Sequence, residues 1–315
     1  MMRRTRPSPA LRSAVRAAAA AAVGAAIAVP LLRKRLRVPA PVTLAACAAG
    51  PLGAAVLAPR GRPRGVAVFA MQMWAFTMAH ELPFDDPARA RERLRVRYPI
   101  VADRLLGGGA LPNARLQRGL ARLPGRRFAD RVLTWTHWLW FVEPYLALAV
   151  ILVRHPERFP RAARQLAAVF DIGCAGYFAV PTAPPWWAFE AGATGGEEVR
   201  RIMIGVGEET WRSAWPRMYG ALGGNPWAAM PSLHFATSLA VGLSLAEASR
   251  FEGAVGLAYA AKLGFALVYL GEHYVSDLIA GAALVAFVRR AEPRLGPLAA
   301  RSGEVLARFE RVANG

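Results

Sequence analysis

Two histidines and an aspartate have the types and the spacing for nucleophilic catalysis. His273 and Asp277, in G-E-H-Y-V-S-D at 271–277, lie at positions i and i+4 and would share one face of a helix. A carboxylate there accepts one imidazole N–H, fixes the tautomer and raises the basicity of the other nitrogen, which suits a nucleophilic histidine. His234, in M-P-S-L-H-F-A at 230–236, comes from another segment and can act as a general acid.

The residues next to these histidines suit a phosphate group. Ser232 and the backbone N–H groups at a helix N-terminus can bind a phosphate oxygen. Glu272 is either a substrate contact or a charge at a helix N-terminus, where an acid is favourable. The cations for the phosphate are sought in the adjoining loop, at Arg200, Arg201, Arg212 and Arg217. Each of these arginines could instead be a solvated loop charge. We select Ser232, Glu272, Arg212 and Arg217 as the predicted binding residues.

A zinc site is the alternative use of the same side chains. Two histidines and one aspartate would supply three ligands, but no further His, Cys or carboxylate has metal-ligand spacing. The sequence therefore predicts catalysis without a metal and without another cofactor.

The elements that must position these residues are apolar. The hydrophobic fraction is 55%, and several runs approach the ~20 residues that a helix needs to cross a bilayer. These runs lie near 14–32, 39–59, 65–82, 132–153, 163–183, 231–248, 254–271 and 273–288. We expect an all-α, polytopic membrane bundle of about six to eight transmembrane helices with interfacial amphipathic segments.

The order of the last spans brings the two histidines to one face of the membrane. The span that begins at 230–236 runs inward, a tight turn at Arg250–Glu252 reverses the chain, and the next span ends at Gly271. P-T-A-P-P-W-W at 181–187 ends an earlier span on the same face. The basic loop at 154–164 and the arginines after Phe287 favour the cytoplasm, which places the site outside. The long basic segment 83–131 conflicts with this orientation.

Two further expectations concern charges. The 116–123 stretch, L-Q-R-G-L-A-R-L, predicts an amphipathic helix on the membrane surface. Lys262, Glu143 and Asp171 should lie at similar depth in the bundle. An unpaired charge there is costly, so we expect Lys262 to pair with one of the carboxylates. The alternative is that each group reaches the interface or water separately.

The net charge of +19 does not indicate a nucleic-acid partner. The arginines are spread over loops between apolar spans, where they suit anionic lipid headgroups, and no nucleic-acid-binding motif accompanies them. The abundance of Arg, Ala, Gly and Pro is typical of a GC-rich genome. We expect an integral protein of the plasma membrane of a GC-rich bacterium, without a nucleic-acid partner.

The motifs resemble those of a known group of membrane enzymes. P-S-L-H at 231–234 and H-Y-V-S-D at 273–277 resemble the second and third motifs of the type 2 phosphatidic acid phosphatase superfamily. P-T-A-P-P at 181–185 and E-H-Y-x-x-D resemble the branch that contains inositol phosphorylceramide synthase and sphingomyelin synthase. The resemblance covers about residues 130–290. It implies that His273 attacks phosphorus, Asp277 supports it, and His234 protonates the leaving oxygen.

The resemblance also has gaps. The superfamily's usual first motif, a Lys followed by Arg-Pro, has no clear counterpart, and Ala266 and Leu267 stand where the third motif usually has Ser-Arg. The synthase branch lacks that pair as well.

We therefore expect a membrane enzyme that cleaves or transfers a phosphate ester of a lipid through a phosphohistidine, with water or an alcohol such as inositol as acceptor. The alternative is a non-catalytic lipid transporter or scaffold on the same bundle. We expect transmembrane helices and a basic interfacial segment over 1–130, a catalytic core over 131–290 and a basic tail over 291–315.

Overall fold

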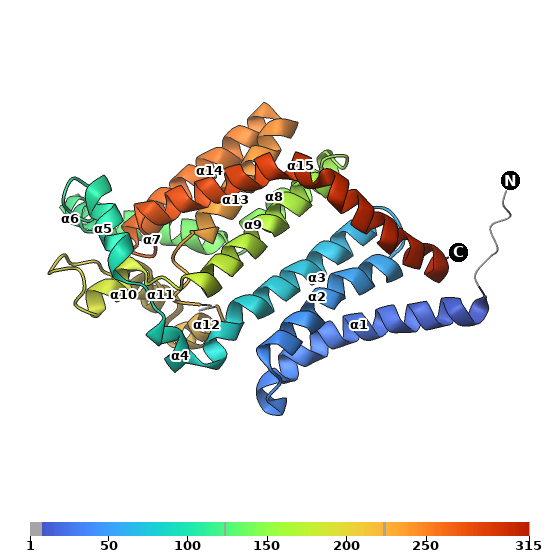
Figure 1. Cartoon of the computed structure of the whole chain (residues 1–315). Helices are drawn as coiled ribbons and strands as arrows, with labels where there is room; N and C mark the ends of the chain where they lie inside the picture. Colours follow the sequence, from blue (N-terminus) through green and yellow to red (C-terminus); the bar gives the residue numbers. More distant parts are fainter. Residues whose placement is uncertain (1–7, 123, 223–224, 315) are drawn as a thin grey trace. The chain divides into compact units, whose positions relative to one another are not determined.

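The chain is helical throughout the part that the structure covers. The computed structural model describes residues 8–122, 124–222 and 225–314, which fold into helices and, within these ranges, two isolated β-bridges without a strand (Figure 1). This confirms the predicted all-α class. The helices are α1 (Pro9–Leu36), α2 (Ala40–Leu57), α3 (Arg62–Glu81), η1 (Leu82–Asp85), α4 (Pro87–Glu92), α5 (Arg97–Leu106), α6 (Pro112–Ala121), α7 (Arg126–Leu139), α8 (Glu143–Arg154), α9 (Phe159–Ala179), α10 (Pro185–Glu190), α11 (Ile202–Trp211), η2 (Arg212–Ala214), α12 (Trp215–Leu222), α13 (Leu233–Ala248), α14 (Arg250–Tyr269) and α15 (Val275–Asn314).

Two compact units make up the chain. The first unit comprises residues 1–85 and 289–315, and the second, here the core unit, comprises residues 86–288. In the first unit, α1 and α2 pack closely through small residues, since a Cβ on Gly53 would lie 2.6 Å from the carbonyl oxygen of Ala19. The buried Arg33 binds Asp85, with Nε and Oδ2 2.8 Å apart. Glu310 of α15 binds Arg60 and Arg64.

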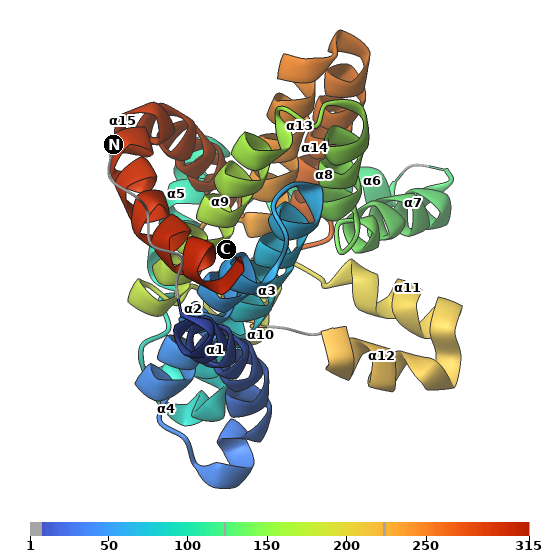
Figure 2. The same cartoon turned by 90° about the vertical axis from the view of Figure 1, so that its right-hand side faces the viewer.

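The core unit is built around the α13–α14 hairpin, which packs against α7, α8 and α9. Ser249 is both the last cap of α13 and the first cap of α14, so the reversal expected at Arg250–Glu252 takes place one residue earlier. The two helices approach closely where glycines face each other: a Cβ on Gly242 would lie 3.1 Å from the carbonyl carbon of Gly256. α11 and α12 fold back on one another across η2, with Gly207 against the ring of Trp215 (Figure 2).

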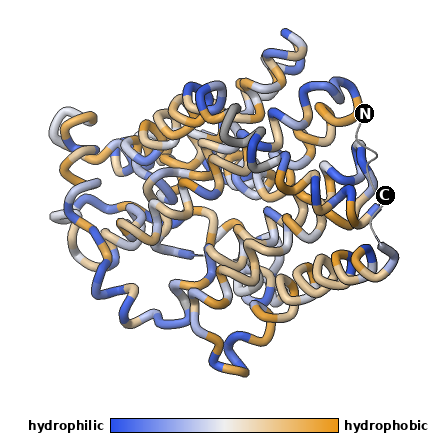
Figure 3. The backbone as a smooth tube through the Cα atoms, turned by 45° about the vertical axis from the view of Figure 1, so that its right-hand side comes forward, coloured by the Kyte–Doolittle hydropathy of each residue, from blue (hydrophilic) through white to orange (hydrophobic). Residues whose placement is uncertain are grey.

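The apolar runs expected to span a membrane fall on helices, and Figure 3 shows hydrophobic residues along them. The run at 132–153 differs from the expectation, because α7 ends at Leu139 and α8 begins at Glu143 with a bend of 55°. Pro144 at the start of α8 has no N–H to continue the preceding helix.

Among the described residues, α1, α2 and α14 are long and apolar enough to cross a membrane, and α7 with α8 would form a fourth span. These helices are compatible with a membrane protein; the expected six to eight spans stay a prediction.

The expected pairing of Lys262 is wrong. The Lys262 side chain is exposed on α14, and it forms no ion pair with Glu143 or Asp171 in the described part of the chain. Glu143 instead accepts a hydrogen bond from Ser238 Oγ at 2.7 Å. Equal depth along neighbouring helices does not bring side chains together, because the rotation of each helix decides which way they point.

The segment 83–131 contributes to the core unit. Leu116 and Leu120 of α6, which we expected on the membrane surface, pack against a buried cluster that includes Ala266 and Tyr269 at the end of α14. Asn113 and Gln117, which lie on the same side of α6 as these leucines, are also buried. The helix is therefore amphipathic, but the side that holds its leucines and amides faces protein.

Candidate active site

Three of the predicted residues form one line of hydrogen-bonded side chains. Asp277 Oδ2 lies 3.2 Å from His273 Nδ1, and His273 Nε2 lies 3.1 Å from His234 Nδ1. Asp277 is fully buried and His273 is 3% exposed, whereas His234 is only partly buried. His273 contacts Asp277 as expected, but it lies in the loop before α15 (Val275–Asn314) and does not share a helix face with Asp277. The line is reached from the His234 side.

His234 is positioned by the N-terminus of α13. Ser232 is the N-cap of this helix, and its Oγ accepts a hydrogen bond from the Phe235 N–H at 3.3 Å. The Ser232 N–H donates to the carbonyl of Asp277 at 3.0 Å, which joins the beginning of α13 to the beginning of α15. The predicted phosphate ligand Ser232 therefore already has a structural role next to both histidines.

The P-T-A-P-P segment braces the chain that leads to His234. Thr182 donates its N–H to the Trp227 carbonyl at 2.9 Å and accepts from the Ala229 N–H at 3.3 Å. Tyr98 of α5 contacts the Thr182 hydroxyl at 2.6 Å, and Tyr177 donates to the Pro231 carbonyl at 2.7 Å. This segment fixes the loop before α13 rather than reaching the histidines itself.

The N-terminus of α15 is capped by a residue from a distant helix. Asp103 of α5 is fully buried, and its two carboxylate oxygens each accept a backbone N–H of α15, from Val275 and Ser276, at 2.8 Å. A negative charge at a helix N-terminus satisfies donors that the helix leaves unpaired and interacts favourably with its dipole. Asp103 therefore fixes the turn of backbone that lies between His273 and Asp277.

Two amides of α6 hold the loop that carries His273. Asn113 Nδ2 donates to the carbonyls of Val268 and His273, at 2.7 and 2.9 Å. One turn later, Gln117 Nε2 donates to the Tyr269 and Arg200 carbonyls, both at 2.8 Å, and Gln117 Oε1 accepts the Arg200 N–H. Sequence reasoning missed Asp103, Asn113 and Gln117. The i, i+4 spacing of the two amides beside the leucines was the signal available for α6.

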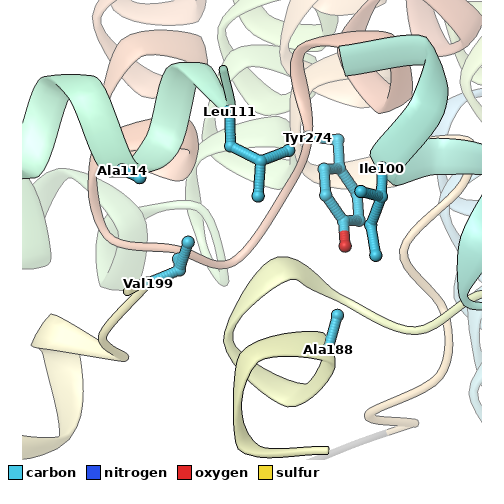
Figure 4. Close-up of a cluster of buried hydrophobic side chains, with 6 residues drawn as sticks. All are labelled: Ile100, Leu111, Ala114, Ala188, Val199 and Tyr274. Carbon is cyan, nitrogen blue, oxygen red and sulfur yellow. The ribbon is translucent and has the colours of Figure 1, made fainter. Parts of the chain in front are cut away.

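Tyr274 anchors the same loop on its apolar side. It is fully buried between α5, α6 and α10, together with Ile100, Leu111 and Ala188 (Figure 4). Its N–H donates to Asp277 Oδ2 at 2.8 Å, so this carboxylate oxygen binds both the loop and His273. Burial on either side of His273 leaves the imidazole little freedom to turn away from His234.

Glu272 is bound to an arginine beside the histidine line. Arg201 Nε and Nη2 lie 2.8 and 3.0 Å from the two Glu272 oxygens, and the guanidinium also contacts the Tyr219 hydroxyl and stacks 4.3 Å over the Trp186 ring. Burial by itself raises the pKa of Glu272, but the positive charge of Arg201 more than offsets this, so the pKa lies below its usual value. Glu272 is therefore a charged partner of Arg201.

The structure does not bring the other two predicted cations to the site. Arg212 begins η2 and Arg217 lies on α12, and both side chains are exposed. Neither has a hydrogen bond or ion pair to the histidine line within the described residues. Of the four arginines considered in this loop, Arg201 is the one held next to His273, because its partner Glu272 immediately precedes that residue.

A third histidine extends the line. His137, near the end of α7, places Nε2 3.3 Å from His234 Nε2 and is 4% exposed. The Trp140 ring also packs against His234, with ring centroids 4.1 Å apart. No three His, Cys, Asp or Glu side chains are arranged as metal ligands in the ranges that the structure describes.

Comparison with known protein families finds one match. A family model described as PAP2 superfamily matches residues 114–289, more than half of the chain. The chain belongs to the PAP2 superfamily. The matched range contains His137, His234, His273 and Asp277, whereas Asp103 and Asn113 lie before it. Neither the curated proteins nor the solved structures yielded a match. Membership of the PAP2 superfamily supports a phosphatase-type enzyme that acts on a lipid phosphate.

Proposed function

We propose that this PAP2 protein cleaves a phosphate ester of a lipid through a phosphohistidine at His273 and passes the group to water or to an alcohol. The observation that carries the proposal is the hydrogen-bonded line Asp277–His273–His234, which supplies a base, a nucleophile and an acid in sequence. The alternative, a non-catalytic lipid transporter or scaffold, would be favoured if the experiment below detected no turnover.

The nucleophile is Nε2 of His273. Asp277 accepts the N–H at Nδ1, so the neutral imidazole carries its lone pair on Nε2 and cannot turn. In the structure this lone pair faces Nδ1 of His234, so the substrate phosphorus must enter between the two rings. Attack forms the N–P bond as the bond from phosphorus to the leaving oxygen breaks.

His234 moves the proton in both halves of the reaction. Protonated His234 gives its Nδ1 hydrogen to the leaving oxygen of the lipid, which departs as an alcohol. Neutral His234 then takes a proton at Nδ1 from the acceptor, water or alcohol, whose oxygen attacks phosphorus and releases Nε2 of His273. Each half-reaction ends with the imidazole ready for the other one.

The phosphate oxygens need donors at the mouth of the site. Ser232 and the N-terminus of α13 lie beside His234, and Arg201 can exchange one of its contacts with Glu272 or Tyr219 for a phosphate oxygen. Ala266 and Leu267 stand where the third motif usually has Ser-Arg; both are apolar and fully buried, so neither can bind a phosphate oxygen. Arg212 and Arg217 stay proposed ligands that would have to approach when substrate binds.

The sequence motifs favour an alcohol as the acceptor of the phosphate group. P-T-A-P-P and E-H-Y-x-x-D resemble the branch that transfers inositol phosphate, which favours a polyol over water. Glu272 with Arg201 would provide hydroxyl-binding groups beside the nucleophile.

The test uses the purified full-length protein with a panel of lipid phosphates and diphosphates, with and without inositol. We expect phosphate release or formation of an inositol phosphate product, and loss of both in His273→Ala. The matched control is His155→Ala, since His155 binds Glu252 at the far end of α14 and should leave turnover unchanged. Turnover of His273→Ala near that of the wild type would refute the covalent mechanism.

A further inference from the structure

We propose that His137 is a positioning residue for the acid–base histidine: it accepts the Nε2–H of protonated His234 and so stabilises the imidazolium that the reaction needs. This inference rests on the proposed function. It concerns a residue outside the two signature motifs, in the Trp-rich turn at the end of α7.

The contact is well defined by its surroundings. His137 lies two residues before the end of α7, and its ring meets the His234 ring at an interplanar angle of 62° with centroids 4.9 Å apart. Nε2 faces Nε2 at 3.3 Å, within hydrogen-bonding distance. The two rings of His137 and His273 therefore occupy opposite nitrogens of His234, one at Nε2 and the other at Nδ1.

Counting hydrogens gives His137 its role. Imidazolium His234 carries a hydrogen on both nitrogens, and the one on Nδ1 faces His273 and the phosphate. The hydrogen on Nε2 needs an acceptor, which His137 Nε2 supplies when His137 is neutral with its own hydrogen on Nδ1. After Nδ1 has given its proton to the leaving oxygen, His234 is neutral and keeps the Nε2–H···Nε2 bond. Nδ1 is thus fixed as the nitrogen that gives and takes protons.

A core-filling role explains His137 less well. Nδ1 of His137 is buried and has no hydrogen-bond partner among the described residues. A polar atom buried in this way is unfavourable, and an apolar ring would fill the same space without that cost. The contact of Nε2 with His234 accounts for a histidine at this position, because Nε2 then accepts the hydrogen bond and Nδ1 carries the hydrogen.

Other charged and titratable groups also act on this position, and the pH dependence must be considered with them. His234 of α13 contacts His137 directly, and the charges that act on His137 are Glu272 and His273 before α15 and Arg201 before α11. On the neighbouring elements, Glu209 of α11 binds Arg131 of α7, and the Tyr259 hydroxyl of α14 donates to the Thr136 carbonyl. None of these groups is changed in the variants below.

The experiment compares the pH profiles of His137→Gln and His137→Phe in the purified full-length enzyme. Gln keeps an acceptor oxygen but does not titrate, whereas Phe fills the space without an acceptor. Loss of the acceptor should destabilise imidazolium His234, so the alkaline limb of kcat should move to lower pH by about one pH unit in His137→Phe, a tenfold change in the proton affinity of the general acid. His137→Gln should keep the limb near its wild-type place. His155→Phe, a histidine removed elsewhere, should leave the profile unchanged.

The result that overturns the inference is an alkaline limb that stays in place in His137→Phe, or that shifts equally in His137→Gln. A uniform loss of activity at every pH would indicate packing alone and would also overturn it. If His137→Phe does not give folded protein, His137→Ala makes the same comparison with Gln. The proposed function would fail by a different result, turnover by His273→Ala, so the two failures can be told apart.

Discussion

Replacing Asp103 with alanine should destabilise the core unit and disable the active site together. The change removes the acceptor of two backbone N–H groups at the start of α15, each bonded at 2.8 Å in a fully buried place. A buried donor left unpaired costs about 1–3 kcal/mol, so two of them predict a loss of roughly 2–6 kcal/mol in the free energy of unfolding. Because these groups lie between His273 and Asp277, kcat should fall as well.

The assay is thermal unfolding in detergent, followed by tryptophan fluorescence, together with kcat measured on the folded fraction. Asp103→Asn keeps one carbonyl acceptor and should lose about half as much stability. The matched control is Asp86→Ala, which removes a carboxylate that caps the short, exposed α4 through the Arg89 N–H at 3.1 Å and should have a much smaller effect. Wild-type stability and kcat in Asp103→Ala would refute the idea that this carboxylate holds the catalytic turn.

Three further outcomes can be measured with the same protein. His234→Ala should slow substrates with poor leaving groups most, because their departure depends on the proton that His234 supplies, and equal slowing across a leaving-group series would contradict its role as the acid. Turnover should survive extensive EDTA treatment, whereas loss that zinc restores would indicate a metal site. The pKa of Glu272 is lowered in the folded protein, so the stability that its pair with Arg201 contributes is present above the usual pKa of Glu and is lost as the pH falls through the lowered value. Glu272→Gln should remove this acid dependence from the free energy of unfolding. The same slope of unfolding free energy against pH in both proteins would show that the pair contributes nothing.

The residues that the sequence could place are those whose spacing is local. The contact of His273 with Asp277 was predictable from their positions four apart at the start of an apolar run, although His273 lies in the loop before α15 and not on the helix. The meeting of His234 with His273 followed from the direction of successive spans. The break between α7 and α8 has a local cause in Pro144, although the apolar run continues across it.

The residues that sequence reasoning missed bind groups that are far away in the sequence. Asp103 and Asn113 bind backbone groups, and the identity of a residue does not reveal which distant N–H or carbonyl it will meet. His137 lies inside the apolar run at 132–153, which predicted only a membrane span. The wrong expectation for Lys262 has a related cause, since sequence gives the depth of a residue along its helix but not the direction in which its neighbours lie.

The capping of α15 by Asp103 has a consequence for the order in which the enzyme is made. The bonded pair is separated by 172 positions, and Asn113 is 160 positions from the His273 carbonyl that it binds. Ribosomes therefore complete α5 and α6 long before the turn that these helices are built to receive, and their buried polar groups wait without partners until the final helix is inserted. A chain that ended before Val268 would lack the segment that Asp103 and Asn113 bind, and with it His273 and Asp277. In the proposed mechanism a nascent chain therefore stays inactive until this turn has been made and bound.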